Sequence, residues 1–489
     1  MSVTADQERT AVASVPTQLF IGGEWRDAAG GDTVAVEDPS TGETLAEVAD
    51  ATEDDARAAF DAACAAQGEW AKHPPRERGE ILRRAFEAIT ARADELALIM
   101  TLEMGKPLAE SKAEITYAAE FFRWFAEEAV RIEGRFATAP NGVGRVITMR
   151  QPVGPVYAIT PWNFPMAMGT RKIGPAVAAG CTIVMKPAQQ TPLSMLALAE
   201  ILAEAGLPEG VLNVITASSS STVSEPIISD PRLRKLTFTG STEVGRKLVE
   251  QSAPGLVRVS MELGGNAPFL VFADADVDAA VEGAVIAKMR NIGEACTAAN
   301  RFHVAEAVAD EFTEKLAGKL ADMPVGRGTE DDVKVGPLID DDQRSKVAEL
   351  VDDALGKGAQ AVLGGTKVDG AGYFYAPTVL GGVPGEARLL REEIFGPVAP
   401  VVGFGDEEEA IAAANDTEYG LVAYVYTSDL KRAFRVVEGL ETGMVGLNQG
   451  MVSNASAPFG GVKASGFGRE GGPEGIHEYL EVKYVAMAM

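Results

Sequence analysis

The segment from Asn291 to Arg301, N-I-G-E-A-C-T-A-A-N-R, places a single thiol, Cys296, among small residues. A cysteine acts as a nucleophile only as its thiolate, and a neighbouring histidine is the usual means of forming it. The chain has only three histidines, and the nearest, His303, lies in an apolar stretch typical of a structural strand residue. We therefore expect another group to activate the thiol: a carboxylate, backbone dipoles or a cationic cofactor ring.

A carboxylate that could serve as a base lies 34 residues before this thiol, at Glu262 in M-E-L-G-G-N. It ends a stretch that is typical of a strand, and paired glycines follow closely. A carboxylate in such a setting can act as a general base. A capping or ion-pair role explains the residue equally well, so this segment alone leaves both roles open.

Two further segments could bind a phosphate or a nucleotide. In F-T-G-S-T-E-V-G, residues 238–245, Gly240 and Ser241 lie between a predicted strand and a predicted helix, where backbone N–H groups favour anions. The segment lacks the G-x-G-x-x-G pattern, and an ordinary strand–helix turn would also explain it. Lys186 ends another predicted strand, at the carboxyl edge where open α/β sheets bind ligands, although a surface lysine is the simpler interpretation by itself.

Alternating strands and helices must bring these residues together. From about residue 152 apolar strands alternate with helices, which predicts parallel sheet and a doubly wound nucleotide-binding domain. The alternation repeats after about residue 264, which predicts a second α/β domain with Cys296 in a loop. Asp274 and Asp276 can cap the helix that precedes this loop.

The first 130 residues have a different pattern of apolar residues, mostly helical. The spacing of apolar residues predicts three helices, and the G-G pair in Q-L-F-I-G-G-E-W-R predicts a short hairpin. Residues 1–16 are predicted to form a loose arm. The predicted helices cover residues 53–66, 75–104 and 108–128.

Composition restricts the class of protein. The chain has 489 residues, 46% hydrophobic and 24% charged, which is typical of a globular protein with two or three domains. Its net charge of −27 disfavours nucleic acid as a partner. No apolar run approaches the roughly 20 residues that span a membrane, and the start resembles no secretory signal. Because Cys64, Cys181 and Cys296 are scattered, without metal-ligand spacing, we expect a cytoplasmic protein with no metal site.

Taken together, seven ordered motifs resemble the aldehyde dehydrogenase superfamily. The similarity extends from I-G-G-E-W near the start to E-V-K-Y-V near the end, and the separations from Glu262 to Cys296 and from Cys296 to Glu393, 34 and 97 residues, also match. The motifs are P-W-N-F-P, M-K-P-A, F-T-G-S-T-E-V-G, M-E-L-G-G-N, G-E-A-C, E-E-I-F-G-P and P-F-G-G-V-K-A-S-G-F-G-R-E. The joint match strengthens each functional interpretation above.

The resemblance implies a mechanism and assigns residues to it. Cys296 would attack the aldehyde carbonyl to form a thiohemiacetal, and Asn163 with the Cys296 backbone N–H would form the oxyanion hole. After hydride transfer, Glu262 would activate the water that hydrolyses the thioester to a carboxylic acid. Glu470 would be a second proton carrier. Many relatives have glutamine in place of Glu294; an ionised Glu294 would raise the Cys296 pKa, unless its side chain points to solvent.

The resemblance also implies a nicotinamide cofactor. Ser241 would contact its pyrophosphate and Lys186 its adenosine ribose. Relatives strict for NAD usually carry a glutamate three residues after this lysine, which repels the 2′-phosphate of NADP, whereas this chain has the neutral Gln189. We therefore expect NADP to be accepted or preferred, with NAD as a second cofactor. The implied cofactor-binding residues are Thr160, Pro161, Trp162, Lys186, Gln189, Gly240, Ser241, Glu393 and Phe395.

Three residues predict the substrate. In succinate-semialdehyde dehydrogenases, which the chain resembles most, the positions of Arg171, Arg290 and Ser453 bind the distal carboxylate of the substrate. A guanidinium fork suits a carboxylate because it binds both oxygens. We therefore expect oxidation of succinate semialdehyde to succinate.

Alternatives remain at this stage. The substrate could be glutarate semialdehyde or a general aliphatic aldehyde, and in the latter case both arginines would be structural. A non-redox cysteine hydrolase is a remote alternative, because the cofactor motifs are intact. An inactive structural homologue is equally remote, because Cys296, Glu262 and Asn163 are all present.

The resemblance implies an α/β fold of three parts. A doubly wound cofactor-binding domain would comprise residues 10–124 and 148–263, and a second α/β catalytic domain residues 264–464. Residues 125–147 and 465–489 would form a small β oligomerisation element. An exposed edge strand calls for a partner, so we expect a homodimer or a homotetramer.

Overall fold

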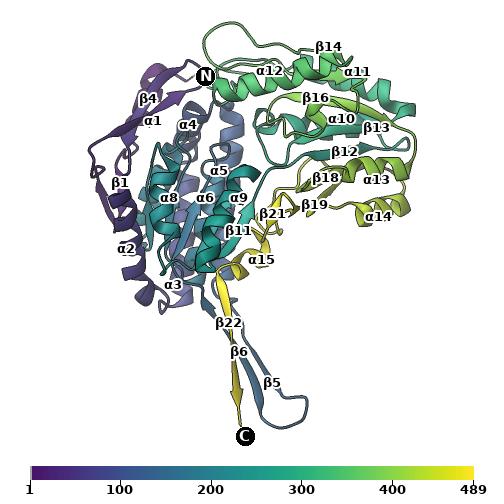
Figure 1. The fold of residues 1–489 in the computed structure, drawn as a ribbon. Coiled ribbons are helices and arrows are strands. Elements are labelled where there is room, and N and C mark those ends of the chain that lie inside the picture. Colours follow the sequence, from purple (N-terminus) through teal and green to yellow (C-terminus); the bar gives the residue numbers. More distant parts are fainter. Residues whose placement is uncertain (1–2, 489) are drawn as a thin grey trace.

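The computed structural model describes residues 3–488, and each half of it is built around a large β-sheet (Figure 1). The first sheet has eight strands, and its five central strands run parallel. From edge to edge they are β2 (Glu24–Arg26), β1 (Leu19–Ile21), β9 (Leu212–Val214), β8 (Ile183–Lys186), β7 (Val156–Ile159), β10 (Lys235–Thr239), β11 (Arg258–Glu262) and β21 (Gly466–Phe467). Strands β7 to β10 are buried throughout, as parallel strands between two helix layers must be.

Helices cover both faces of this sheet. They are α1 (Ala5–Ala13), α2 (Glu53–Trp70), α3 (Pro75–Ala91), α4 (Ala93–Met104), α5 (Leu108–Glu128), α6 (Ala167–Ala179), α7 (Leu193–Glu204), α8 (Ser220–Ile228) and α9 (Thr242–Ser252). Helices α2, α8 and α9 share one hydrophobic core with the strands, and α3 to α7 share another. The predicted doubly wound α/β architecture is confirmed.

The second sheet has seven strands, and helices again lie on both of its faces. From edge to edge its strands are β14 (Gln360–Leu363), β15 (Thr378–Gly381), β16 (Val398–Phe404), β13 (Ala299–Ala305), β12 (Ala267–Val271), β18 (Val422–Tyr426) and β19 (Met444–Leu447). Its helices are α10 (Val277–Met289), α11 (Glu306–Ala321), α12 (Asp341–Gly356), α13 (Glu407–Asn415) and α14 (Leu430–Gly439). Only β14 runs antiparallel to its neighbour in this sheet.

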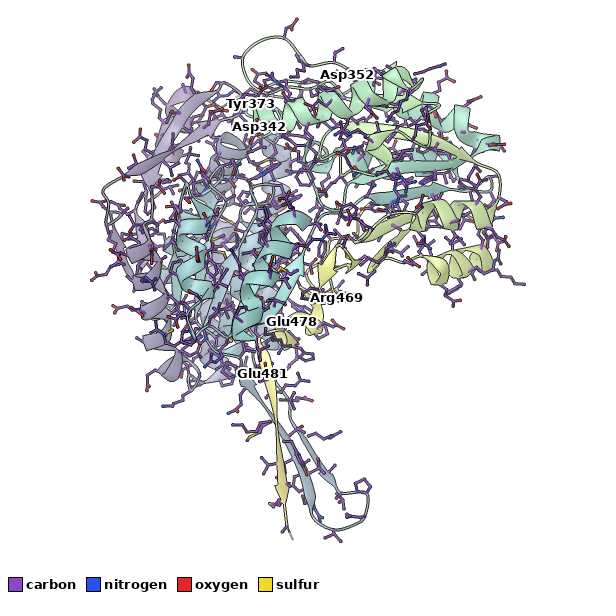
Figure 2. All side chains as sticks on the ribbon, viewed as in Figure 1. Asp342, Asp352, Tyr373, Arg469, Glu478 and Glu481 are labelled. Atoms are coloured by element: carbon purple, nitrogen blue, oxygen red, sulfur yellow. The ribbon has the colours of Figure 1, made fainter. Side chains whose placement is uncertain are left out.

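A three-stranded arm projects from the first half (Figure 1). It consists of β5 (Arg135–Thr138), β6 (Arg145–Pro152) and the C-terminal β22 (Leu480–Met487), paired antiparallel. Figure 2 shows Glu478 and Glu481 where β22 leaves the body of the molecule. Large apolar side chains on the arm are exposed, among them Phe136, Val482 and Tyr484 at 66%, 61% and 61%.

Shorter elements complete the chain. They are β3 (Thr33–Asp38), β4 (Glu43–Ala49), β17 (Tyr419–Gly420), β20 (Val462–Lys463), α15 (Gly472–His477) and the 3₁₀ turns Ala253–Gly255, Arg290–Gly293 and Arg388–Leu390. Between residues 3 and 488, no helix has the length and apolar character needed to cross a membrane.

Two local predictions were wrong. Within the expected loose arm, Ala5–Ala13 form α1, because Thr4 and Gln7 make a reciprocal capping box. The single helix expected over 75–104 is divided at Arg92, whose φ of −101° and ψ of 16° end α3 before α4 begins. Apolar spacing continues across this break, so periodicity alone does not reveal it.

The two aspartates near α10 have different roles. The side chain of Asp276 accepts a hydrogen bond from the Ala279 backbone N–H, as predicted for an N-cap. The prediction for Asp274 was wrong, because its carboxylate turns to Thr427, Ser428 and the start of α14 instead.

Candidate active site

A cavity of about 210 Å³ lies between the carboxyl ends of strands in the first half and the loops that precede β12, β13 and β16 in the second, and Cys296 forms part of its wall. Strands β7, β10 and β11 end at this cavity, which is the carboxyl edge where open α/β sheets bind ligands. The predicted site residues that line it are Pro161, Trp162, Asn163, Gly240, Ser241, Glu262, Cys296, Glu393 and Phe395. Residues as far apart in sequence as Pro161 and Phe395 therefore share one site.

Two polar residues of this wall lie outside the quoted motifs and were missed by the sequence reasoning. Gln343 and Lys346, both on α12, also line the cavity. The Gln343 side chain donates to the backbone carbonyl of Phe395 at 2.6 Å. In the sequence both residues look like polar positions of a surface helix, so no local signal marks them.

The nucleophile loop is built from unusual backbone. Asn291, Ile292 and Gly293 have successive φ values of 55°, 61° and 79°, a left-handed region that is unfavourable for the first two. The Asn291 side chain donates to the backbone carbonyls of Asn163 and Glu294, at 3.0 and 2.9 Å. These bonds tie the loop before Cys296 to the loop after β7.

Cys296 is a protonated thiol in this environment. Burial raises its pKa to about 12; the nearby Arg171 and Arg290 charges lower it in part, while Glu262 and Glu393 raise it. His303 lies in β13 and burial lowers its pKa to about 3, so it is a neutral structural residue. The thiolate must therefore form with the help of a ligand or a base.

Asn163 is held over this loop from two sides. Its side-chain N–H donates to the backbone carbonyl of Glu294 at 3.0 Å, which leaves the second N–H of the amide available. The buried Lys106 donates to the Asn163 backbone carbonyl at 2.7 Å and pairs with Glu114 at 2.5 Å. Lys106 and Glu114 thus position the Asn163 loop, a role for which the sequence offered no signal.

Glu262 and Glu470 form a buried carboxylate pair with opposite properties. Neither oxygen of Glu262 has a hydrogen-bond partner within residues 3–488, and burial together with Glu470 raises its pKa well above the usual value. Burial opposes ionisation of Glu470 as well, but Lys172 and Arg171 outweigh it and hold its pKa below the usual value. The Glu470 carboxylate lies 2.6 Å from the Lys172 ammonium and 2.7 Å from the Arg171 guanidinium. One member can therefore take up a proton while the other stays charged.

The three predicted substrate residues are not alike. Arg290 donates to the Ser453 hydroxyl at 2.9 Å, and Ser453 lines a second cavity, of about 500 Å³. Arg171 is buried, pairs with Glu470 and lies 4.0 Å from the centre of the Phe459 ring. Arg171 thus shares the Glu470 carboxylate with Lys172.

The predicted cofactor residues divide into two groups. Ser241 caps α9 and Glu393 accepts a bond from the Gly265 backbone N–H at 2.9 Å, while burial raises the Glu393 pKa to about 7. Lys186 and Thr160 are buried at the ends of their strands, outside the cavity wall, and burial lowers the Lys186 pKa to about 8. Gln189 is exposed, three residues beyond Lys186.

Glu294 does not point to solvent. Its side chain is buried and accepts a bond from the Ile339 backbone N–H at 3.1 Å. Burial raises its pKa well above the usual value and so disfavours the charged form. This environment weakens the expected repulsion between Glu294 and a Cys296 thiolate.

A model of the aldehyde dehydrogenase family matches residues 25–485. The chain belongs to this family. It is 58% identical over 444 residues to a succinate-semialdehyde dehydrogenase of Paenarthrobacter nicotinovorans, covering 91% of this chain and 99% of that one. It is 51% identical to a glutarate-semialdehyde dehydrogenase of Pseudomonas putida, covering 96% of this chain and 98% of that one.

Solved structures agree with this family. A crystal structure described as an Escherichia coli NADP-dependent enzyme superposes with a TM-score of 0.96 at 50% identity, and all of both chains is covered. The predicted family, the α/β fold and oxidation of an aldehyde as the activity are confirmed. Within residues 3–488 of this aldehyde dehydrogenase, no cluster of three or more His, Cys, Asp or Glu could hold a metal.

Proposed function

We propose that this aldehyde dehydrogenase oxidises succinate semialdehyde to succinate, with NADP preferred and NAD accepted. The observation that carries the substrate is the contact of Arg290 with Ser453, which presents a guanidinium and a hydroxyl together beside the nucleophile. A distal carboxylate matches this pair, whereas an uncharged aldehyde would leave the Arg290 charge without a partner. The Paenarthrobacter relative, named for the same substrate, supports this choice.

The residues of the cavity fit a nicotinamide dinucleotide. The buried hydroxyls of Thr160 and Thr239, at the ends of β7 and β10, have no hydrogen-bond partner within residues 3–488. Ser241 and the start of α9 suit the pyrophosphate, Lys186 the adenosine ribose, and Glu393 and Phe395 the nicotinamide half. When bound, the cofactor accepts a hydride from the substrate carbon. Gln189 supports NADP, because it puts no negative charge where the 2′-phosphate would lie.

The chain's own residues then divide the chemistry. Cys296 first gives its proton to the Glu262 carboxylate, which releases it to solvent before the hydrolysis step, and the thiolate attacks the aldehyde carbonyl. The free Asn163 N–H with the Cys296 backbone N–H stabilises the oxygen that becomes negative; such donors contribute about 2.7–4 kcal/mol each. Glu262 takes a proton from the water that hydrolyses the thioester, a role suited to a carboxylate of raised pKa. Glu470, linked to Lys172 and Arg171, is the second proton carrier.

Glutarate semialdehyde is the second candidate, since the Pseudomonas relative is named for it and the two aldehydes differ by one methylene. The residues at Arg290 and Ser453 recognise the carboxylate that both substrates share. Chain length therefore has to be decided by measurement.

The deciding experiment measures kcat/KM for succinic semialdehyde, glutaric semialdehyde and butanal, each with NADP and with NAD. We expect at least about a tenfold preference for the acids over butanal, lost in Arg290→Met. Arg123→Met is the matched control, because Arg123 lines the same 500 Å³ cavity and is 58% exposed. Equal rates on all three aldehydes would refute a carboxylate substrate, and a preference for NAD would refute the interpretation of Gln189.

We further infer a cytoplasmic homodimer or homotetramer in which the arm is covered by a second copy. Exposed Phe136, Val482 and Tyr484 support this inference, because apolar side chains gathered on an open sheet are unusual without a partner. The domain ranges 10–124 with 148–263, 264–464, and 125–147 with 465–489 are part of the same proposal.

A further inference from the structure

The hydroxyl of Tyr117, on α5, is a buried polar group without a partner. Its oxygen is buried from solvent and makes no hydrogen bond within residues 3–488. The ring packs edge-on against Phe121, with ring centres 4.9 Å apart, so the side chain is fixed in place. Because a buried hydroxyl without a partner is unfavourable, such a group marks a place where a polar atom of a ligand can bind.

A cation lies close to the Tyr117 ring, although Glu120 and Glu127 line the same cavity. The Arg290 guanidinium lies 5.7 Å from the centre of the Tyr117 ring, and Tyr117 and Ser453 line the same cavity of about 500 Å³. Burial raises the Tyr117 pKa, opposed in part by Arg171, Arg290 and the nearby Ser453 hydroxyl, so the phenol is neutral and remains a donor. The charge of a Cys296 thiolate also acts on Tyr117, so the two side chains belong to the same region of the molecule.

The carboxylate of a substrate needs such a donor. Its two oxygens offer about four acceptor positions, and Arg290 with Ser453 satisfies only some of them. Arg171 is engaged by Glu470 at 2.7 Å, and freeing it would leave that carboxylate buried with one cation fewer. A neutral hydroxyl that is already desolvated can contribute a hydrogen bond without such a loss.

We propose that Tyr117 is a specificity-determining residue whose hydroxyl donates to the distal carboxylate held by Arg290 and Ser453. The inference rests on the proposed function, since it requires a substrate that carries this carboxylate. Tyr117 is then a further group, beside Arg290 and Ser453, that distinguishes an acid-bearing aldehyde from an uncharged one.

The test is Tyr117→Phe, which removes one oxygen atom and keeps the ring. We expect kcat/KM for succinic semialdehyde to fall about tenfold, mainly through KM, while the value for butanal stays within about twofold. Binding of succinate, measured by calorimetry without aldehyde or turnover, should weaken by a similar factor. Thermal stability should not fall, because the lost hydroxyl had no partner in the free protein.

Tyr157→Phe is the matched control. It also removes a buried tyrosine hydroxyl, one that bonds Ser224 at 2.8 Å in the cofactor half, and it should leave the acid-to-butanal ratio unchanged. A Tyr117→Phe enzyme with an unchanged ratio and unchanged succinate affinity would overturn the inference while leaving the proposed function intact. If the wild type itself fails to prefer the acid, the proposed function fails and the role of Tyr117 fails with it.

Discussion

At the scale of single residues, the site depends on charge states that burial sets. Cys296, Glu262 and Glu294 all have raised pKa values because they are enclosed, while Glu470 is kept ionised by two cations. The free enzyme is therefore a resting form with a protonated thiol beside a carboxyl group whose pKa is raised.

The alkylation of Cys296 should report this resting state. Because burial raises its pKa to about 12, the rate of modification by iodoacetamide should increase about tenfold per pH unit between pH 7 and 10, without a plateau. Mass spectrometry of the Cys296 peptide measures this rate, and Cys181, buried with a pKa of about 11, serves as an unreactive reference. A plateau below about pH 9 would mean that the thiolate is stabilised in the free enzyme.

Residue types and their order were enough to predict the chemistry, but not the pairing of charges. Cys296, Glu262 and Asn163 were recognisable because their motifs keep a fixed order and spacing. The ion pair of Arg171 with Glu470 joins residues almost 300 positions apart, and no local pattern encodes such a contact. For the same reason the orphaned hydroxyl of Tyr117 is visible only in the folded chain.

At the scale of elements, the loop after β7, which carries Asn163, is positioned by the buried ion pair of Lys106 with Glu114. Lys106 donates to the Asn163 carbonyl. The Glu114 carboxylate accepts hydrogen bonds from the backbone N–H groups of Met166 and Ala167, both at 3.1 Å. The loop after β7 is thus attached to α5 and to the segment before it.

Lys106→Met should damage both stability and activity. Removing one partner of a buried pair costs about 3–5 kcal/mol, and the loop loses a bond that orients Asn163. The double variant Lys106→Met with Glu114→Gln should regain much of the thermal stability, since no charge is left unpaired, but not the kcat. Melting temperatures and kcat of both variants test this separation. Full recovery of kcat in the double variant would exclude a positioning role for Lys106.

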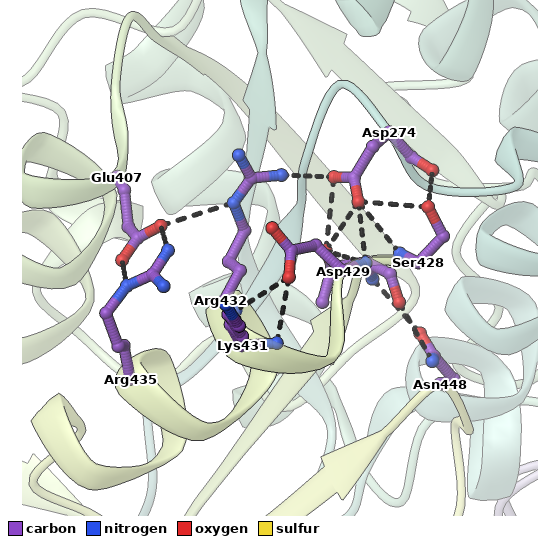
Figure 3. Close-up of polar contacts among 9 residues, drawn as sticks. Asp274, Glu407, Ser428, Asp429, Lys431, Arg432, Arg435 and Asn448 are labelled. Atoms are coloured by element: carbon purple, nitrogen blue, oxygen red, sulfur yellow. Dashed lines mark hydrogen bonds and ion pairs between the residues drawn. The ribbon is translucent and has the colours of Figure 1, made fainter.

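A network of hydrogen bonds and an ion pair around Asp274 joins α14 to the end of β12 (Figure 3). The Asp274 carboxylate accepts hydrogen bonds from the Thr427 hydroxyl and the Ser428 backbone at 2.8 and 3.0 Å, and it pairs with Arg432. Partial burial opposes ionisation, but these donors outweigh it and lower the Asp274 pKa.

Stability should therefore depend on pH through Asp274. Because its pKa is lower in the folded state than the unfolded value of about 3.9, its contribution is present above that value and is lost as pH falls through the folded pKa. Asp274→Asn should lower the melting temperature at pH 7, and its difference from the wild type should shrink as the pH falls below about 3.9. Asp276→Asn, an ordinary cap substitution, should change little at either pH. A constant difference between Asp274→Asn and wild type across this range would contradict the account.

The periodicity of apolar residues predicted helices well where local sequence alone determines the helix. The helix expected over 108–128 is α5, because its apolar spacing and its surroundings agree. The division at Arg92 escaped prediction because the apolar spacing continues on both sides of it. Helix α1 was missed although Thr4 and Gln7 carried a readable capping signal.

At the scale of the whole molecule, we propose that the arm mediates assembly. Val482 and Tyr484 are two residues apart on β22, so they lie on the same face of a strand that ends in solvent. Replacing both with lysine should produce monomers, because charges on that face oppose the docking of a second copy. Light scattering coupled to size exclusion measures the mass, and Lys483→Glu, on the opposite face, is the control. An oligomer that survives the double change would mean that another surface holds the copies together.

The two cavities have an optical consequence. Of four tryptophans, Trp162 stands in the wall of the 210 Å³ cavity and Trp124 in that of the 500 Å³ cavity. A Trp124→Phe enzyme should keep the fluorescence response to the dinucleotide, and a Trp162→Phe enzyme the response to the aldehyde. Rapid mixing of each with both ligands would then give the order in which they arrive, from intrinsic emission alone and without an attached dye.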